Sequence, residues 1–143
     1  MPYRYLTDIA IADAAFEAWG DTVEELFVAA SDATTNVMVE DLGTIHDLER
    51  RSIEVEENAV DMLLFQLLQE LVFYKDAEQL LLRVSSVQIN RNNGSYHLHA
   101  QTYGEAINPE KHELLVDVKA VTLHRFQVEQ TSHGWKAIVI LDT

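Results

Sequence analysis

Oxygen-bearing residues near both ends of the chain are the clearest candidates for chemistry. The sequence closes with Leu141-Asp142-Thr143, which puts an aspartate beside the free carboxylate of the chain at the end of an apolar run. Asp13 is an isolated charge within the apolar run 9–15. Carboxylate oxygens are preferred ligands of Ca²⁺ and Mg²⁺. If the strand that holds Asp13 neighbours the terminal strand, then Asp13, Asp142 and Thr143 would supply part of a divalent-cation shell.

Each of these residues also has a plainer interpretation. The last residues of a chain are often a frayed and solvated strand end. Asp13 would need a partner for its charge if it were buried, but it could equally lie in an exposed turn. The residue types alone leave both interpretations of each position open.

Three histidines fall in segments with the alternation of a strand. His97 and His99 lie on the same face of their predicted strand, so they could present two imidazoles to a transition metal or simply form a solvated face. His124 shares a predicted face with Thr122 and Phe126, and this pattern favours a packed, hydrogen-bonded histidine at the edge of the core.

Several classes of catalytic site are excluded by the composition and the motifs. The chain has no cysteine, which excludes disulfides, thiolate zinc sites and thiol nucleophiles. It has no glycine-rich phosphate loop, no nucleophile elbow and no His-Glu-x-x-His helix. One possible enzyme is a small hydrolase that uses the same carboxylates and a metal ion to activate water. However, no general base and substrate pocket can be assembled from these motifs. We therefore predict no catalytic residue.

The net charge of the chain limits the classes of partner that it can bind. The sequence has 24 acidic and 10 basic side chains, a formal net charge of −14. A field of that sign repels phosphate backbones, so we expect no direct binding to nucleic acid. It could steer the domain to a basic partner, attract cations or only favour solubility. The first residues lack an apolar signal core and no apolar stretch reaches the length of a membrane span, so we expect a cytoplasmic protein.

The elements that must position these residues form one domain, residues 1–143, without linkers or repeats. Helical periodicity runs from about Asp21 to Val37, where Asp21 with Glu24 resembles a capping box. A second and stronger helical pattern begins near Asn58 and places apolar residues on one face as far as Leu71.

Alternation with a period of two predicts strands elsewhere. The predicted segments are 3–6, 14–19, 45–55, 80–84, 96–103, 122–130 and 135–141. Polar turns at 91–94 and 131–134 favour hairpins. Many strands surround two helices that are not interleaved with them, which predicts an α+β two-layer sandwich of mostly antiparallel sheet with two principal helices.

Taken together, these features resemble the archease family along nearly the whole chain. The residues that carry the resemblance are an early Ala12-Asp13, Trp19-Gly20, Glu24-Glu25, 36–38, Asp61, the leucines of the second helix, Glu70, Gly104-Glu105, His112, 118–122, His124 and Leu141-Asp142. The stretch from Lys119 to His124 is the most specific. The chain departs from the family pattern at Ala10, Ile11, Leu67, Gln69 and Leu123.

The resemblance implies a function. Family members look like compact α+β domains that bind a divalent cation, Ca²⁺ or Mg²⁺, through residues corresponding to Asp13, Asp142 and Thr143. They promote guanylylation of the active-site histidine of the GTP-dependent RNA-splicing ligase of tRNA processing, and thereby multiple turnover, without being enzymes themselves. Lys119 and His124 are the expected residues for partner contact and activation.

Other interpretations of the same resemblance stay open. Lys119 could be only a lysine at the rim of a strand end, and the cation could be purely stabilising. The chain could also be a chaperone-like or scaffold module that keeps a basic partner soluble through its acidic surface.

Overall fold

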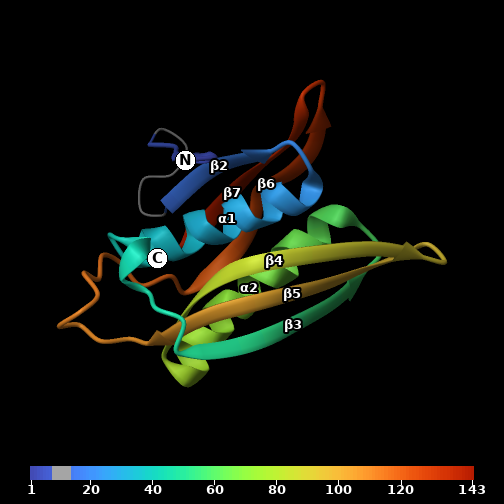
Figure 1. Ribbon diagram of the computed structural model, residues 1–143. Helices are drawn as coiled ribbons and strands as arrows, with labels where there is room; N and C mark the ends of the chain where they lie inside the picture. Colours follow the sequence, from blue (N-terminus) through green and yellow to red (C-terminus); the bar gives the residue numbers. More distant parts are fainter. Residues whose placement is uncertain (8–13) are drawn as a thin grey trace.

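Two antiparallel sheets make up the frame of the protein (Figure 1). The computed structural model describes residues 1–7 and 14–143. The four-stranded sheet has the order β1 (Tyr3–Tyr5), β2 (Ala14–Gly20), β7 (Gly134–Asp142), β6 (Ala120–Thr131). The three-stranded sheet has the order β3 (Glu49–Glu57), β5 (Ser95–Ala106), β4 (Leu80–Asn92). The predicted antiparallel pairing is confirmed.

Two helices join the sheets into one core. Helix α1 (Val23–Met38) packs against β2 of the first sheet and β4 of the second. Helix α2 (Val60–Glu78) packs against β6 of the first sheet and β3 and β4 of the second, and the two helices also contact each other. The predicted α+β architecture with two principal helices is confirmed.

The apolar face predicted for the second helix is the one that the structure buries. Leucines spaced by three and four residues are almost fully inaccessible, namely Leu63, Leu64, Leu67, Leu68 and Leu71. The helix runs to Glu78, beyond the predicted Leu71, because Val72 and Lys75 continue the buried stripe. It ends where Gln79 adopts a left-handed conformation with φ of 55°, a common helix terminus.

The cap of α1 lies one residue later than predicted. Thr22 is the N-cap, and its Oγ1 accepts a hydrogen bond from the Glu25 N–H at 3.1 Å. The Glu25 carboxylate in turn accepts from the Asp21 N–H at 3.1 Å. The predicted pair of Asp21 and Glu24 was therefore wrong by one position, because the hydroxyl of Thr22 and the carboxylate of Glu25 satisfy the free amides at the helix start.

Several strand boundaries also differ from the prediction. Strand β3 begins at Glu49 instead of Ile45, because a 3₁₀ turn, Leu42–Thr44, precedes it and Ile45 is buried outside the strand. Strands β4 and β5 form a longer hairpin than predicted, and Asn93 and Gly94 at its tip both have positive φ. That conformation suits a two-residue turn between right-handed twisted strands.

None of the helices within residues 1–7 and 14–143 combines the length and the apolar character that crossing a membrane would demand.

Candidate functional site: three strand ends around Asp142

Three strands of the larger sheet meet at the position where β7 ends. Ala14, the first residue of β2, pairs with Leu141, and Ala120, the first residue of β6, pairs with Asp142. Strands β2 and β6 run antiparallel to β7 on its two sides. Segments that are more than 100 residues apart in the sequence therefore enter the sheet beside Asp142.

The structure describes two of the three predicted cation ligands, Asp142 and Thr143. The strand that follows Asp13 does neighbour the terminal strand, as the hypothesis required, but Asp13 itself lies outside the described residues. Asp142 is exposed at the end of β7, and Thr143 follows it. Within residues 1–7 and 14–143, no three side chains of the His, Cys, Asp or Glu type gather closely enough to hold a metal ion. The set of Asp13, Asp142 and Thr143 stays a prediction.

The structure brings Lys119 to the same strand end. The backbone N–H of Lys119 donates a hydrogen bond to the carbonyl oxygen of Asp142 at 2.8 Å. The side chain of Lys119 is exposed. A cationic group and a carboxylate thus occupy neighbouring backbone positions on the surface of the molecule.

His124 does not have the environment that its strand pattern predicted. The register between β6 and β7 shifts between Thr122 and Gln127, and Arg125 within the shift has a φ of 54°. This bulge breaks the alternation, so His124 does not share a packed face with Thr122 and Phe126 but is exposed. Among the described residues, no hydrogen bond or ion pair joins His124 to Lys119 or Asp142. The interpretation as a packed core-edge histidine was wrong.

A buried lysine anchors the segment that leads into β6. Lys75 of α2 is only 5% exposed, and its Nζ contacts the carboxylates of Asp76 and Asp117 and donates to the carbonyl oxygen of Val118 at 2.7 Å. Gln69, six residues earlier in α2, accepts a hydrogen bond from the Val121 N–H at 2.9 Å. Helix α2 thereby holds the chain on both sides of Lys119.

The charge of Lys75 is maintained despite its burial. Burial by itself lowers the pKa of an ammonium group, but the hydrogen bonds that Lys75 donates to the carboxylates of Asp117 and Asp76, with the negative charges of those groups, outweigh it and raise the pKa of Lys75 above its ordinary value. Sequence reasoning missed this residue, although its position four residues after Leu71 on the buried stripe was a readable signal.

Comparison with known proteins decides the family. The model of the Archease protein family (MTH1598/TM1083) matches residues 3–143. The chain belongs to the archease family. Protein archease of Pyrococcus abyssi is 36% identical over 141 residues, which cover 98% of this chain and 95% of that protein. Protein archease of Methanosarcina mazei is 33% identical over 141 residues, with 98% and 94% covered.

Solved structures of archease-like proteins agree with this fold. The solution structure of Methanobacterium thermoautotrophicum protein 1598 superimposes with a TM-score of 0.86 at 34% identity and covers 99% of both chains. A crystal structure from Thermotoga maritima, described as an archease and possible chaperone, gives a TM-score of 0.56 at 20% identity over 94% of this chain and 93% of that one. The second likeness supports the fold alone.

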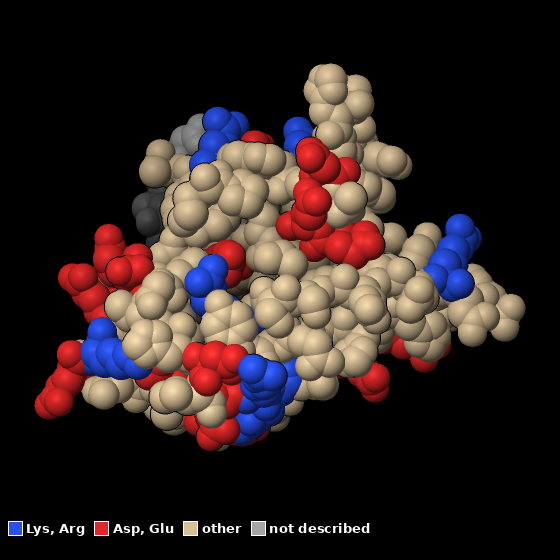
Figure 2. Space-filling model, viewed as in Figure 1, with Lys and Arg blue, Asp and Glu red and all other residues tan. Residues whose placement is uncertain are grey.

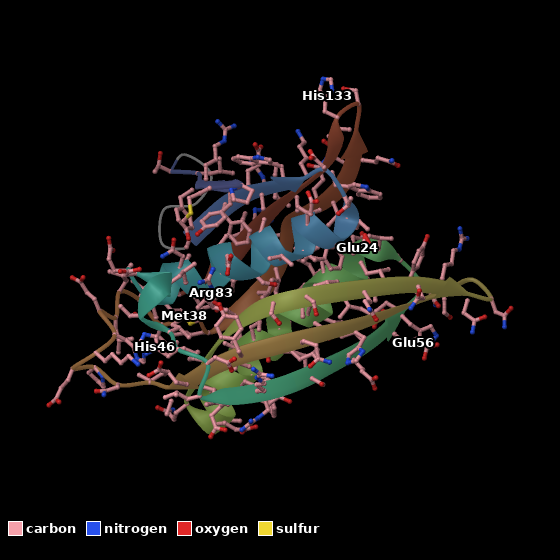
Figure 3. The ribbon with its side chains drawn as sticks, in the orientation of Figure 1. Glu24, Met38, His46, Glu56, Arg83 and His133 are labelled. Atoms are coloured by element: carbon pink, nitrogen blue, oxygen red, sulfur yellow. The ribbon has the colours of Figure 1, made fainter. Side chains whose placement is uncertain are left out.

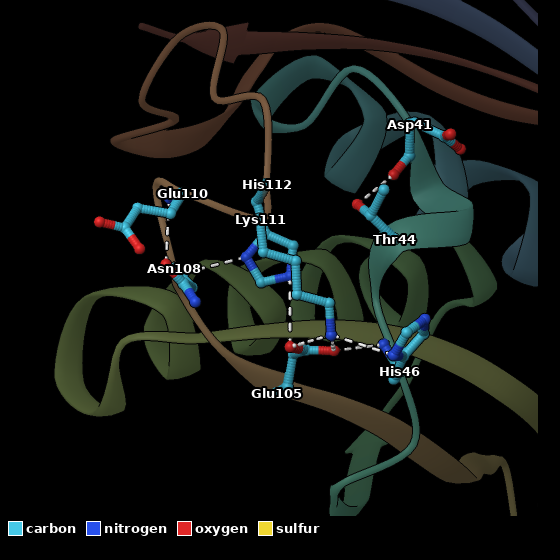
Figure 4. A network of polar contacts seen from close by, with 8 residues as sticks. All are labelled: Asp41, Thr44, His46, Glu105, Asn108, Glu110, Lys111 and His112. Atoms are coloured by element: carbon cyan, nitrogen blue, oxygen red, sulfur yellow. Dashed lines mark hydrogen bonds and ion pairs between the residues drawn. The ribbon is translucent and has the colours of Figure 1, made fainter.

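In this archease-family chain, a second polar network closes the loop between β5 and β6 (Figure 4). Glu105 at the end of β5 is buried, and its carboxylate accepts hydrogen bonds from Lys111 Nζ at 2.7 and 2.8 Å and from the backbone N–H of His46. His112 is buried beside it, with Nδ1 accepting from the Asn108 N–H at 3.0 Å. Its Nε2 lies 3.5 Å from Glu105, too far for a good hydrogen bond.

The network keeps Glu105 ionised. Burial raises the pKa of a carboxyl group, but the hydrogen bonds from Lys111 and His46 and the charge of Lys111 outweigh it, so the pKa of Glu105 lies below its ordinary value. The resemblance singled out Glu105 and His112, and the structure shows that they fix the loop that carries the chain towards Lys119.

The other histidine pair lies on the outer face of the smaller sheet. His97 Nε2 is 3.5 Å from Glu56, and His99 Nε2 is 3.0 Å from the amide nitrogen of Gln101. Glu54 pairs with His99 and Glu56 with His97 across the β3–β5 register. This arrangement matches a solvated polar face, and these side chains do not converge into a metal site among the described residues.

Proposed function

We propose that this archease-family chain is a non-enzymatic protein cofactor of a GTP-dependent RNA-splicing ligase. In this role it promotes guanylylation of the ligase histidine and repeated turnover, and the strand ends around Asp142 face the ligase nucleotide. The chemistry stays in the ligase, while this chain supplies a divalent-cation site and a lysine.

The observation that carries the proposal is the meeting of β2, β7 and β6 at Asp142. Ala14, which directly follows Asp13 in the sequence, pairs with Leu141, and the Lys119 N–H bonds to the Asp142 carbonyl oxygen. A divalent cation held by carboxylates can coordinate phosphate oxygens, and a lysine beside it favours the same anionic group. Lys75 and Gln69 of α2 hold the chain on both sides of Lys119, so the group is placed on a rigid support.

The charge of the chain supports a basic partner. An RNA ligase must be basic around the cleft that grips RNA, and a domain with a net charge of −14 complements such a surface. Complementary fields accelerate encounter and fix orientation, which suits a cofactor that must associate with the ligase.

The test is multiple-turnover RNA ligation by the ligase from the same source, with GTP and divalent metal, in the presence and absence of this protein. We expect stimulation by the wild-type chain and its loss with Asp142→Asn, which removes one carboxylate charge from an exposed position. Glu54→Gln is the matched control, because it removes one exposed carboxylate from β3, which belongs to the other sheet than β7. It should stimulate like the wild type.

The outcomes separate the competing functions. Equal stimulation by wild type and Asp142→Asn would favour a scaffold or chaperone-like module in which any cation is only structural. No stimulation by the wild-type chain would reject the proposed function. Turnover of a substrate by the isolated protein would reveal the hydrolase alternative.

A further inference from the structure

An open groove lies along α1, beside the end of β2 that is remote from Asp142. Its volume is about 630 Å³. Its walls come from the N-terminal residues, the end of β2 and the middle of β4, and its floor is α1. The lining residues are Pro2, Trp19, Gly20, Asp21, Glu24, Glu25, Val28, Ala29, Asp32, Ser86 and Val87.

The floor of the groove is one stripe of residues along α1. Glu24, Val28 and Asp32 are spaced by four residues and therefore form one stripe along α1. Eight residues of α-helix span about 12 Å, which is the length of a short peptide segment. Figure 3 shows Glu24 near the start of this helix and Arg83 under its later part. The groove is apolar in its middle, at Val28 and Ala29, and acidic at its ends.

Trp19 gives the groove an aromatic wall. Trp19 is 39% exposed, although its indole is a large and mostly apolar side chain. The backbone is fixed: the Trp19 N–H donates to the Pro2 carbonyl oxygen at 2.9 Å, and Trp19 pairs with Lys136 of β7. Gly20 lets α1 start close to this strand, since a Cβ there would lie 2.5 Å from the Leu26 nitrogen.

All charged side chains that line the groove are acidic. Four carboxylates line it, and no lysine or arginine does. Asp32 is neutralised by Arg83 at 3.1 and 3.2 Å, and Glu25 is used in the helix cap. The side chains of Asp21 and Glu24 make no hydrogen bond or ion pair with any described residue, and Figure 2 shows acidic side chains gathered over the region where α1 starts. An unpaired acidic end therefore adjoins an exposed tryptophan.

We propose that this groove binds an extended segment of a protein partner in which an arginine is flanked by apolar residues. The guanidinium group would stack on Trp19 and bond to the carboxylates of Asp21 and Glu24, while the flanking apolar side chains cover Val28 and Val87. A planar guanidinium matches both an indole face and a carboxylate, which an ammonium group does less well. Peptide recognition of this kind combines an apolar anchor with a charged contact.

The groove is separate from the strand ends at Asp142. In the β2–β7 register, Gly20 pairs with Trp135 at one end and Ala14 with Leu141 at the other. Seven strand residues span about 20 Å. The proposal therefore stands independently of the cation-site function, and one surface can be removed without touching the other.

The experiment is a titration of the ¹⁵N-labelled full chain with the peptide acetyl-Leu-Arg-Leu-amide, followed by NMR. We expect saturable shifts of the Trp19 indole N–H and the Val28 amide, with the amide of Leu141, at the other end of the β2–β7 pairing, as an internal reference. The peptide acetyl-Leu-Gln-Leu-amide keeps the two flanking leucines and lacks the charge. One exposed ion pair contributes up to about 1 kcal/mol, or about fivefold in affinity, so the Gln peptide should bind about fivefold more weakly.

Two variants localise the effect. Glu24→Gln should weaken the binding of the Arg peptide by about fivefold. Glu56→Gln removes the same charge from an exposed site on β3 and should leave the affinity for the Arg peptide unchanged. Equal binding of both peptides, equal weakening by both variants, or shifts that map outside the groove would overturn the proposal. A dimer seen by sedimentation, with concentration-dependent NMR shifts at the groove residues, would overturn it as well, since the occupant would then be a second copy of the chain.

Discussion

The ammonium group of Lys75 lies 2.7 Å from the carbonyl oxygen of Val118, 43 residues further along the chain. This contact joins the last turns of α2 to the segment that enters β6. Lys75 is buried, whereas Asp76 and Asp117 are largely exposed. Without these contacts the two carboxylates would still be solvated by water, but the ammonium group would be left buried without a partner. The contact therefore anchors the residues that directly precede β6.

Lys75→Met should lower the free energy of unfolding by about 1–3 kcal/mol, because the substitution leaves the buried carbonyl of Val118 without a donor. Urea denaturation measures this change. Lys136→Met is the control: its ammonium group pairs with Glu129 at 3.1 Å but is 38% exposed, so its loss should cost less than about 1 kcal/mol. Equal losses in the two variants would contradict a special role for Lys75.

Glu105 should make the stability of the protein depend on acid pH. Its pKa is held below the ordinary value in the folded state, so its contribution is complete above about pH 4.3, the ordinary pKa of glutamate. That contribution is lost as the pH falls through the lowered pKa of the folded state. The measurement is the urea midpoint between pH 7 and pH 3 for the wild type and for Glu105→Gln.

The variant should be less stable than the wild type at pH 7, and the difference should shrink below the pKa of the folded state. A constant difference across the range would show that Glu105 stabilises only by packing. Glu40→Gln, at an exposed position, provides the control for a general change of charge.

Leu67→Ala should test the predicted face of α2. Leu67 is fully buried, and removal of a buried leucine side chain costs about 2–5 kcal/mol. Leu123→Ala removes the same atoms at a residue that is 58% exposed, so the change in unfolding free energy should stay within about 0.5 kcal/mol. Similar effects at both positions, measured by chemical denaturation, would contradict the assigned core.

Local patterns in the amino-acid sequence determined much of the fold. The spacing of Leu63, Leu64, Leu67 and Leu68 is sufficient to predict α2 and its buried face, because a helix repeats every 3.6 residues whatever surrounds it. The turn at Asn93-Gly94 is also local, since few residues other than asparagine and glycine adopt positive φ easily. Absence of cysteine excluded thiol chemistry without any structure.

Tertiary structure decided what the local pattern left open. The environment of His124 depends on a register shift between β6 and β7, which is a property of two strands and not of the residues around one histidine. The role of Lys75 depends on Asp117 and Val118, which approach it only after the chain has passed through β4 and β5. The groove at Trp19 exists because α1 packs between β2 and β4. Pairings of distant segments are set by the packing of the whole core, so only the folded chain brings these residues together.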